Sequence, residues 1–233
     1  MNSDISLVQW DTDKFGIKIG NLILEEPITQ EKIKIARQEA ALLDYDLLYM
    51  KEVFIPNNLL SEELILADEK VIYIKKSNGG TMCSPRVVSL LHTPLTDELL
   101  NLSLESGKYS RYKLDKKLPE SCFTTLYHAW IVNSLTGAIA DDVLAVKDGD
   151  RVKGILTYKK KGKVYEIGII AVSPENTGKG IGSLLMQSFL SKVPVGCTVE
   201  VATQKRNRVA CNYYEKNGFM VDKISNIYHL WIK

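Results

Sequence analysis

Short apolar runs and one amphipathic stretch alternate over the first third of the chain. Within the amphipathic stretch, Ile33, Ala36 and Ala40 recur at the spacing of one helix face. The apolar runs are short and bounded by polar or turn-forming residues, as is typical of strands. The order strand, helix, strand, helix, strand is predicted for residues 19–25, 30–43, 47–53, 57–67 and 71–74. Residues 1–80 are therefore expected to form a small βαβαβ domain.

A turn-rich stretch at residues 77–85 interrupts this pattern and indicates a domain boundary. Beyond it, Thr96 is the predicted cap of a helix, and Asp148-Gly149-Asp150 is a hairpin signal between two alternating runs. Further helices are predicted at 120–135, 182–192 and 208–217, and strands at 141–147, 151–159, 163–172, 198–202, 220–224 and 228–232. Residues 85–233 are expected to form a second, larger α/β domain.

The strand predicted at 163–172 runs directly into a glycine-rich turn, Thr177-Gly178-Lys179-Gly180-Ile181-Gly182, which a helix follows. Such an arrangement presents free backbone N–H groups at a helix N-terminus, and these bind phosphate. Glycines allow unusual φ values and let a pyrophosphate approach the main chain closely. The pattern therefore predicts a phosphate-binding turn, with the charge of Lys179 nearby.

Two familiar phosphate-binding motifs fit this turn poorly. A Walker loop needs Ser or Thr after its lysine, and Gly180 follows Lys179. A dinucleotide fingerprint needs its third glycine where Ser183 stands, although Glu200 lies at a tolerable distance for a ribose contact. The dinucleotide motif and a turn that binds nothing stay open on the glycines alone.

The run from Val172-x-Pro174 through Gly182 resembles motif A of the GNAT acetyltransferase superfamily. The second half of that signature, Asn-x-x-Ala-x-x-x-Tyr-Glu-x-x-Gly-Phe, is matched in order and spacing by Asn207, Ala210, Tyr214-Glu215 and Gly218-Phe219. The resemblance covers about residues 85–233. It implies the GNAT fold and acetyl-CoA as cosubstrate, without a metal.

Thr177 stands where the family usually has Arg or Gln, so the backbone amides of residues 178–183 are expected to carry the pyrophosphate. By the resemblance, the backbone at two strand positions pairs with the pantetheine, and Asn207 both caps its helix and contacts the cofactor arm. The cofactor residues so implied are Ile170, Val172, Thr177, Gly178, Lys179, Gly180, Ile181, Gly182, Ser183 and Asn207.

Two residues are predicted to move protons. Family analogy makes Tyr214 the general acid that protonates the leaving sulfur; the alternative is a core aromatic beside Tyr213. Glu166 is expected to take the proton of the amine, directly or through water, and its apolar neighbours would raise its pKa. The alternative for Glu166 is a solvated acid paired with Lys161 or Lys163.

A narrower resemblance points to the two-domain GNATs that acetylate nucleotide-linked amino sugars, such as the dTDP-fucosamine (dTDP-4-amino-4,6-dideoxygalactose) acetyltransferases. It rests on the order of short segments, namely Trp10-Asp11, Phe15-Gly16, Ser110-Arg111-Tyr112 with Asp115, the run 130–134, the run 201–204 and Tyr228-His229-Leu230-Trp231. It implies that Ser110, Arg111 and Asp115 belong to the acceptor site, with Arg111 as a clamp for a diphosphate. Tyr127 and Trp130 are candidates to stack on a base or sugar; core packing is the alternative.

Composition narrows the class of protein further. With 45% hydrophobic and 25% charged residues the chain is globular, and a net charge of +2 without a basic patch argues against a nucleic-acid partner. No apolar run is long enough for a membrane span, and the scattered cysteines Cys83, Cys122, Cys197 and Cys211 suit a reducing compartment. A cytoplasmic location is expected; a homodimer is compatible with the resemblance, and the oligomeric state stays open.

Together these features predict an N-acetyltransferase that moves acetyl from acetyl-CoA to a nucleotide-linked amino sugar, with dTDP as the expected nucleotide, in the synthesis of a surface polysaccharide precursor. Two alternatives stay open. One is a GNAT that acts on another small amine or a protein N-terminus, and the other is a CoA-binding module without catalysis, which Thr177 suggests. The sequence names neither the sugar nor the position of its amine.

Overall fold

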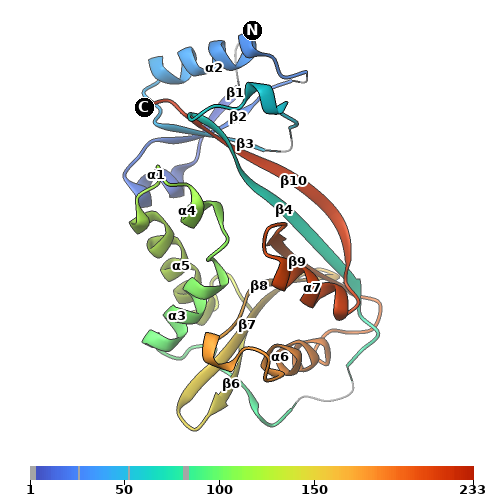
Figure 1. Ribbon diagram of the computed structural model, residues 1–233. Helices are drawn as coiled ribbons and strands as arrows, with labels where there is room; N and C mark the ends of the chain where they lie inside the picture. The colour runs from blue at the N-terminus through green and yellow to red at the C-terminus, as the bar shows by residue number, and fades with distance from the viewer. Residues whose placement is uncertain (1–3, 26, 52, 81–83) are drawn as a thin grey trace.

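A single ten-stranded sheet runs through the computed structural model, which describes residues 4–25, 27–51, 53–80 and 84–233 (Figure 1). Its strand order is β1-β2-β3-β10-β4-β9-β8-β7-β6-β5. The pairs β2–β3 and β8–β9 are parallel, whereas the other neighbours are antiparallel. The strands are β1 (Asp4–Leu7), β2 (Ile19–Ile23), β3 (Leu47–Lys51), β4 (Leu64–Lys76), β5 (Val87–Ser89), β6 (Asp142–Asp148), β7 (Arg151–Lys161), β8 (Val164–Val172), β9 (Thr198–Gln204) and β10 (Met220–Trp231).

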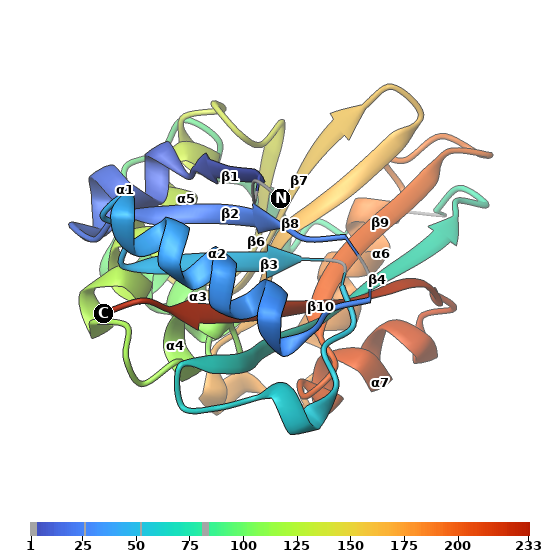
Figure 2. The same cartoon turned by 90° about the horizontal axis from the view of Figure 1, so that it is seen from above.

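Helices cover both faces of the sheet because each face carries apolar side chains. On one face α3 and α5 pack on β6–β8, and on the other α6 and α7 pack on the middle strands, while α2 lies across the N-terminal strands (Figure 2). Within the described ranges, none of the helices is long and apolar enough to cross a membrane. The helices are α1 (Gln9–Phe15), α2 (Gln30–Leu42), α3 (Asp97–Ser106), α4 (Arg111–Leu114), α5 (Glu120–Leu135), α6 (Ile181–Leu190) and α7 (Arg208–Lys216).

The starts of the helices differ in how they are capped. The predicted caps are confirmed: Thr96 Oγ1 accepts a hydrogen bond from the Leu99 amide at the start of α3, and Asn207 Oδ1 accepts one from the Ala210 amide at the start of α7. Helix α6 begins at Ile181, and the preceding residue Gly180, with φ of 79°, provides no side-chain cap. Its first N–H groups are therefore left available to an anion.

Most of the predicted elements are confirmed, but two predictions were wrong. Residues 57–67 do not form a helix: a short 3₁₀ turn, Asn57–Leu59, precedes the long strand β4. The apolar run 71–74 belongs to a strand that starts at Leu64 and that pairs on both sides, so the sheet overrides local helix propensity. The two closing strands are one strand, β10, with two irregularities in its pairing.

The sheet and its cores cross the predicted domain boundary. Strand β10 pairs with β3 and β4 of the N-terminal portion, and β4 pairs with β9 (Figure 1). Tyr228 and Leu230 pack in the core beneath α2, and Val71 and Tyr73 pack in the core beneath α6 and α7. The division at 77–85 stays a prediction about folding units, and Cys83 lies outside the described residues.

Candidate active site

The parallel pair β8–β9 separates part-way along its length and opens a cleft. Paired residues run from Val164–Thr198 to Ile167–Val201 and stop there. Beyond this point, a cavity of about 580 Å³ lies between the ends of the two strands, the glycine-rich turn and the starts of α6 and α7. Gly168 and Ala202 are the first residues past the last pair, and both line the cavity.

All but one of the residues predicted for the cofactor line this cleft: Ile170, Val172, Thr177, Gly178, Gly180, Ile181, Gly182, Ser183 and Asn207. The exception is Lys179, whose Nζ lies 3.3 Å from Asn176 Oδ1. Its ammonium group therefore contacts the turn and does not line the cleft. An anion in this part of the cleft would be bound by main-chain N–H groups.

The glycine-rich turn has the geometry of an anion cradle. Gly178 and Gly180 have φ of 80° and 79°, values that other residues rarely adopt. A Cβ placed on either glycine would meet no atom within 4 Å, so open space lies over the backbone. Together with the uncapped start of α6, this arrangement fits a pyrophosphate group.

Tyr214 lies at the junction of the core and the cleft. Its side chain is buried, its ring packs against Tyr73 and Phe219, and it lines the cleft. Burial raises the pKa of Tyr214 above the usual value of a phenol, so the hydroxyl is protonated at neutral pH. Core packing and proton donation, the two alternatives from the sequence, are therefore compatible in one side chain.

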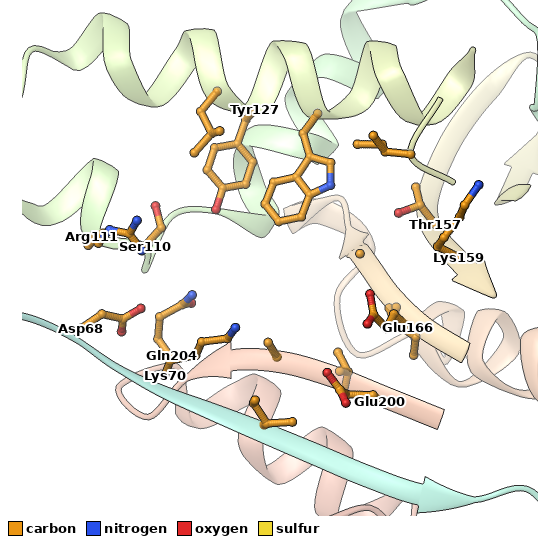
Figure 3. Close-up of a pocket in the computed structure, with 18 of the residues that line it drawn as sticks. Asp68, Lys70, Ser110, Arg111, Tyr127, Thr157, Lys159, Glu166, Glu200 and Gln204 are labelled. Atoms are coloured by element: carbon orange, nitrogen blue, oxygen red, sulfur yellow. The ribbon is translucent and has the colours of Figure 1, made fainter. Parts of the chain in front are cut away.

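A second cavity, of about 690 Å³, adjoins the cleft. Its floor is the sheet face formed by alternate residues of β4, β9 and β8, and its roof is formed by α4 and α5 (Figure 3). The two cavities share Tyr127, Trp130, Gly168, Ala202 and Gln204. A molecule in the second cavity can therefore reach a group delivered through the cleft at these shared residues.

Ser110, Arg111, Tyr127 and Trp130, four of the residues predicted for the acceptor, line the second cavity. The Arg111 guanidinium contacts two aromatic rings, 4.8 Å from the centroid of Tyr49 and 4.3 Å from that of Tyr112. Arg111 Nε is buried and has no hydrogen-bond partner among the residues that the structure describes. The arginine is thus held rigidly with one donor unused.

Asp115 lies elsewhere than the sequence predicts. It lines neither cavity; its buried Oδ2 lies 2.6 Å from His229 Nδ1 and accepts a hydrogen bond from Trp231 Nε1 at 3.0 Å. Burial alone would raise the pKa of Asp115, but the contacts with His229 and the Lys117 amide outweigh it and hold the pKa below its usual range. Asp115 therefore connects strand β10, which carries His229 and Trp231, to the segment that carries Arg111.

Replacing Asp115 with alanine is expected to lower the free energy of unfolding by about 3 kcal/mol at pH 7, because two buried donors lose their partner. Since the folded pKa is lowered, the wild-type contribution is present above the unfolded value of 3.8 and is lost below it. Urea unfolding at pH 7 measures the change. Asp44→Ala, at an exposed ion pair, is the control and should change stability far less; equal effects would contradict a structural role for Asp115.

Glu166 lines the second cavity on the same strand face as Gly168, as the alternation of side chains along a strand predicts. Its side chain is 35% exposed, and Oε2 lies 2.6 Å from Lys161 Nζ. The carboxylate is therefore engaged in the ion pair that the sequence left as the alternative.

Sequence reasoning missed the contribution of the N-terminal strands to this cavity. Asp68 and Lys70 of β4 and Lys51 of β3 line it, as do Glu200 and Gln204 of β9. The sequence signal was weak because Asp68 lies between residues 57–67, which were wrongly predicted to form a helix, and the apolar run 71–74. No group of three or more His, Cys, Asp or Glu side chains that could hold a metal ion occurs among the described residues.

Residues 104–219 match the Acetyltransferase (GNAT) family. The curated spore coat polysaccharide biosynthesis protein SpsD of Bacillus subtilis (strain 168) is 28% identical over 138 residues, which are 58% of this chain and 47% of SpsD. The matched region is thus less than half of that relative. The chain therefore carries a GNAT acetyltransferase domain.

Solved structures agree on the fold. A functionally unknown conserved protein from Staphylococcus epidermidis superimposes with a TM-score of 0.65 at 13% identity, covering 98% of this chain and 90% of that one. A GCN5-related N-acetyltransferase from Sphaerobacter thermophilus gives 0.59 at 11% identity, covering 99% and 76%. A tandem GNAT protein from the clavulanic acid biosynthesis pathway gives 0.53 at 13%, covering 92% and 75%. The predicted α/β GNAT fold is confirmed.

Proposed function

We propose that this GNAT acetyltransferase transfers the acetyl group of acetyl-CoA to the amine of a nucleotide-linked amino sugar, in the synthesis of a surface polysaccharide precursor. The observation that carries the proposal is the pair of adjoining cavities, one with an anion cradle and one with a charged and aromatic lining. They meet at five shared residues, where donor and acceptor would come together.

Acetyl-CoA fits the cleft in its chemistry. The cradle at Gly178 and Gly180 and the start of α6 would bind the pyrophosphate through main-chain N–H groups. The edge of β8 beyond Ile167 is not paired with β9, so its backbone at Ile170 and Val172 would pair with the pantetheine amides. Bound there, acetyl-CoA would supply an activated acetyl group as a thioester.

The second cavity fits a sugar nucleotide. Lys51, Lys70 and Arg111 gather in its lining, and burial followed by the nearby Arg111 charge lowers the pKa of Lys51. A diphosphate would relieve the repulsion among these cations. Tyr127 and Trp130 offer ring faces to a sugar or base, and the relative named for spore coat polysaccharide biosynthesis supports a sugar acceptor.

In this reaction the nitrogen of the acceptor forms a bond to the acetyl carbon as the bond from that carbon to sulfur breaks. Tyr214 would donate its hydroxyl proton to the sulfur, which leaves as the thiol. The proton of the amine must leave in the opposite direction, into the second cavity. The walls around Trp130 and Tyr127 would hold the amine against the acetyl group and exclude water.

Thiol release tests the proposal. Acetyl-CoA is incubated with the protein and a panel of dTDP- and UDP-linked amino sugars, free amino sugars, small polyamines and a peptide with a free N-terminus. Rapid thiol release with one or more nucleotide-linked sugars is expected, with kcat/KM at least about 100 times that for the free sugar, because the diphosphate contacts are lost without the nucleotide. Faster turnover of a polyamine or the peptide, or CoA binding without turnover, would contradict it.

A further inference from the structure

Asp68 is a buried carboxylate with an unused oxygen in the second cavity. Its side chain is 4% exposed, it lines the cavity floor, and Oδ1 has no hydrogen-bond partner among the residues that the structure describes. An unpaired buried acceptor carries a large free-energy cost. A ligand that donates a hydrogen bond to Oδ1 would remove this cost.

The surroundings of Asp68 place this oxygen in an acceptor site. Figure 3 shows Asp68 facing Ser110 and Arg111 across one end of the cavity, with Gln204 beside it. The titratable groups that face it are Arg111 of α4, Lys70 of β4, Arg206 after β9 and Tyr127 of α5. Although the three cations favour the carboxylate, burial prevails and raises the pKa of Asp68 to about 6.

Asp68 also lies near the junction of the two cavities. Lys70 pairs with Gln204 in the β4–β9 ladder, and Gln204 lines both cavities. Asp68 is two residues from Lys70 on the same strand face, a separation of about 7 Å along the strand. An amine bound at the Gln204 side of the junction would lie next to this carboxylate, in direct contact or through one water molecule.

Resting on the proposed function, we propose that Asp68 binds the amino group of the acceptor and accepts its proton. Glu166, the candidate from the sequence, is 35% exposed and forms an ion pair with Lys161, whereas Asp68 is buried and has an oxygen without a hydrogen-bond partner among the described residues. The N-terminal strands thereby supply a catalytic residue to the GNAT domain.

The proton balance closes. The nitrogen lone pair forms the bond to the acetyl carbon, and the electrons of the carbon–sulfur bond leave with sulfur. The nitrogen proton passes to Asp68 Oδ1, and the proton of Tyr214 passes to sulfur. Asp68 then releases its proton to water, and Tyr214 regains one, so that a neutral amide and a thiol are the products.

The first test is the pH dependence of acetyl transfer by Asp68→Asn. In the wild type, kcat should rise as the pH passes through about 6, because Asp68 must be deprotonated to accept a proton. This rise is the acidic limb of the pH profile. Asp68→Asn should lower kcat by about 100-fold, abolish this limb and leave the KM for acetyl-CoA unchanged. Glu69→Gln, one residue along β4 and paired with Lys205, is the matched control and should keep both rate and limb.

The second test needs no ligand. Because the folded pKa of Asp68 is raised, its protonated form adds stability at low pH that is lost as the pH rises through about 6. Asp68→Asn should therefore melt about 5 °C above the wild type at pH 8 and close to it at pH 4. A gain in stability with a loss of activity separates a catalytic role from a merely structural one.

The outcomes separate this inference from the proposed function. If the wild type acetylates an amine other than a nucleotide sugar, the substrate proposal fails, and Asp68→Asn is tested on that amine instead. Full activity of Asp68→Asn, or loss of the limb in Glu166→Gln in its place, would overturn the role of Asp68 whichever acceptor is used.

Discussion

Tyr214→Phe is expected to lower kcat by about 100-fold while the KM for acetyl-CoA stays within about threefold, because the phenol proton is used only as sulfur leaves. The ring packing against Tyr73 and Phe219 survives in phenylalanine, so the fold should not change. Burial raises the pKa of Tyr214, so its titration should not appear in the pH profile between 6 and about 9. Steady-state thiol release over this pH range measures all three quantities.

Tyr213→Phe is the matched control for this experiment. The two tyrosines are adjacent on α7, and both line the cleft, but the Tyr213 hydroxyl donates a hydrogen bond to the Gly182 carbonyl at 2.7 Å. Its removal should weaken the start of α6 by about 1 kcal/mol and change kcat only a few-fold. Equal kcat for Tyr214→Phe and the wild type would exclude Tyr214 as the acid.

The donor side of the site could be predicted from sequence because its chemistry is local. A strand, a glycine-rich turn and a helix follow one another without interruption, and the backbone itself forms the cradle. Asn207 and Tyr214 follow at spacings that α7 fixes, so order along the chain gives their position in the cleft. Only Lys179 differed, since the polar group of Asn176 holds its ammonium.

The acceptor side could be predicted only in part, because its residues come from strands that are distant in sequence. Arg111 and Trp130 were found by resemblance, but Asp68 joins them through the pairing of β4 with β9, and Lys51 through the pairing of β10 with β3 and β4. Asp115 is the opposite case, a residue that was wrongly predicted to bind the acceptor. It is charged and close to the Ser110-Arg111-Tyr112 motif, but its carboxylate is bound by His229 and Trp231. Pairing across more than 100 residues has no signature in local periodicity.

The same pairing explains why the N-terminal portion matters for function. Strand β4 contributes its apolar face, through Val71 and Tyr73, to the core beneath α6 and α7, and its polar face, through Asp68 and Lys70, to the cavity. A strand with one buried face and one ligand-facing side has strict alternation, and a shift of one residue would move the charges into the core. The GNAT domain and the N-terminal strands therefore form one site.

Gly180→Asp is expected to raise the KM for acetyl-CoA by about 10- to 100-fold with little change in kcat. Gly180 caps α6 with φ of 79°, and a side chain there would extend into the open space over the cradle. A carboxylate at this point would repel a pyrophosphate and oppose the favourable field of the helix N-terminus. A 10- to 100-fold rise in KM corresponds to a loss of about 1.4–2.8 kcal/mol in binding free energy. We attribute this loss to the one negative charge added close to the pyrophosphate.

Gly180→Asn separates charge from backbone strain. Asparagine and aspartate have nearly the same size, and both tolerate the left-handed conformation better than other residues. The asparagine variant should therefore raise the KM only a few-fold, and the difference between the variants should shrink as salt is added, because screening weakens charge repulsion. Binding of CoA by titration calorimetry at low and high ionic strength gives the same comparison without turnover. Equal affinities for the two variants would mean that the pyrophosphate does not lie on this turn, and the donor site would then have to be sought elsewhere in the cleft.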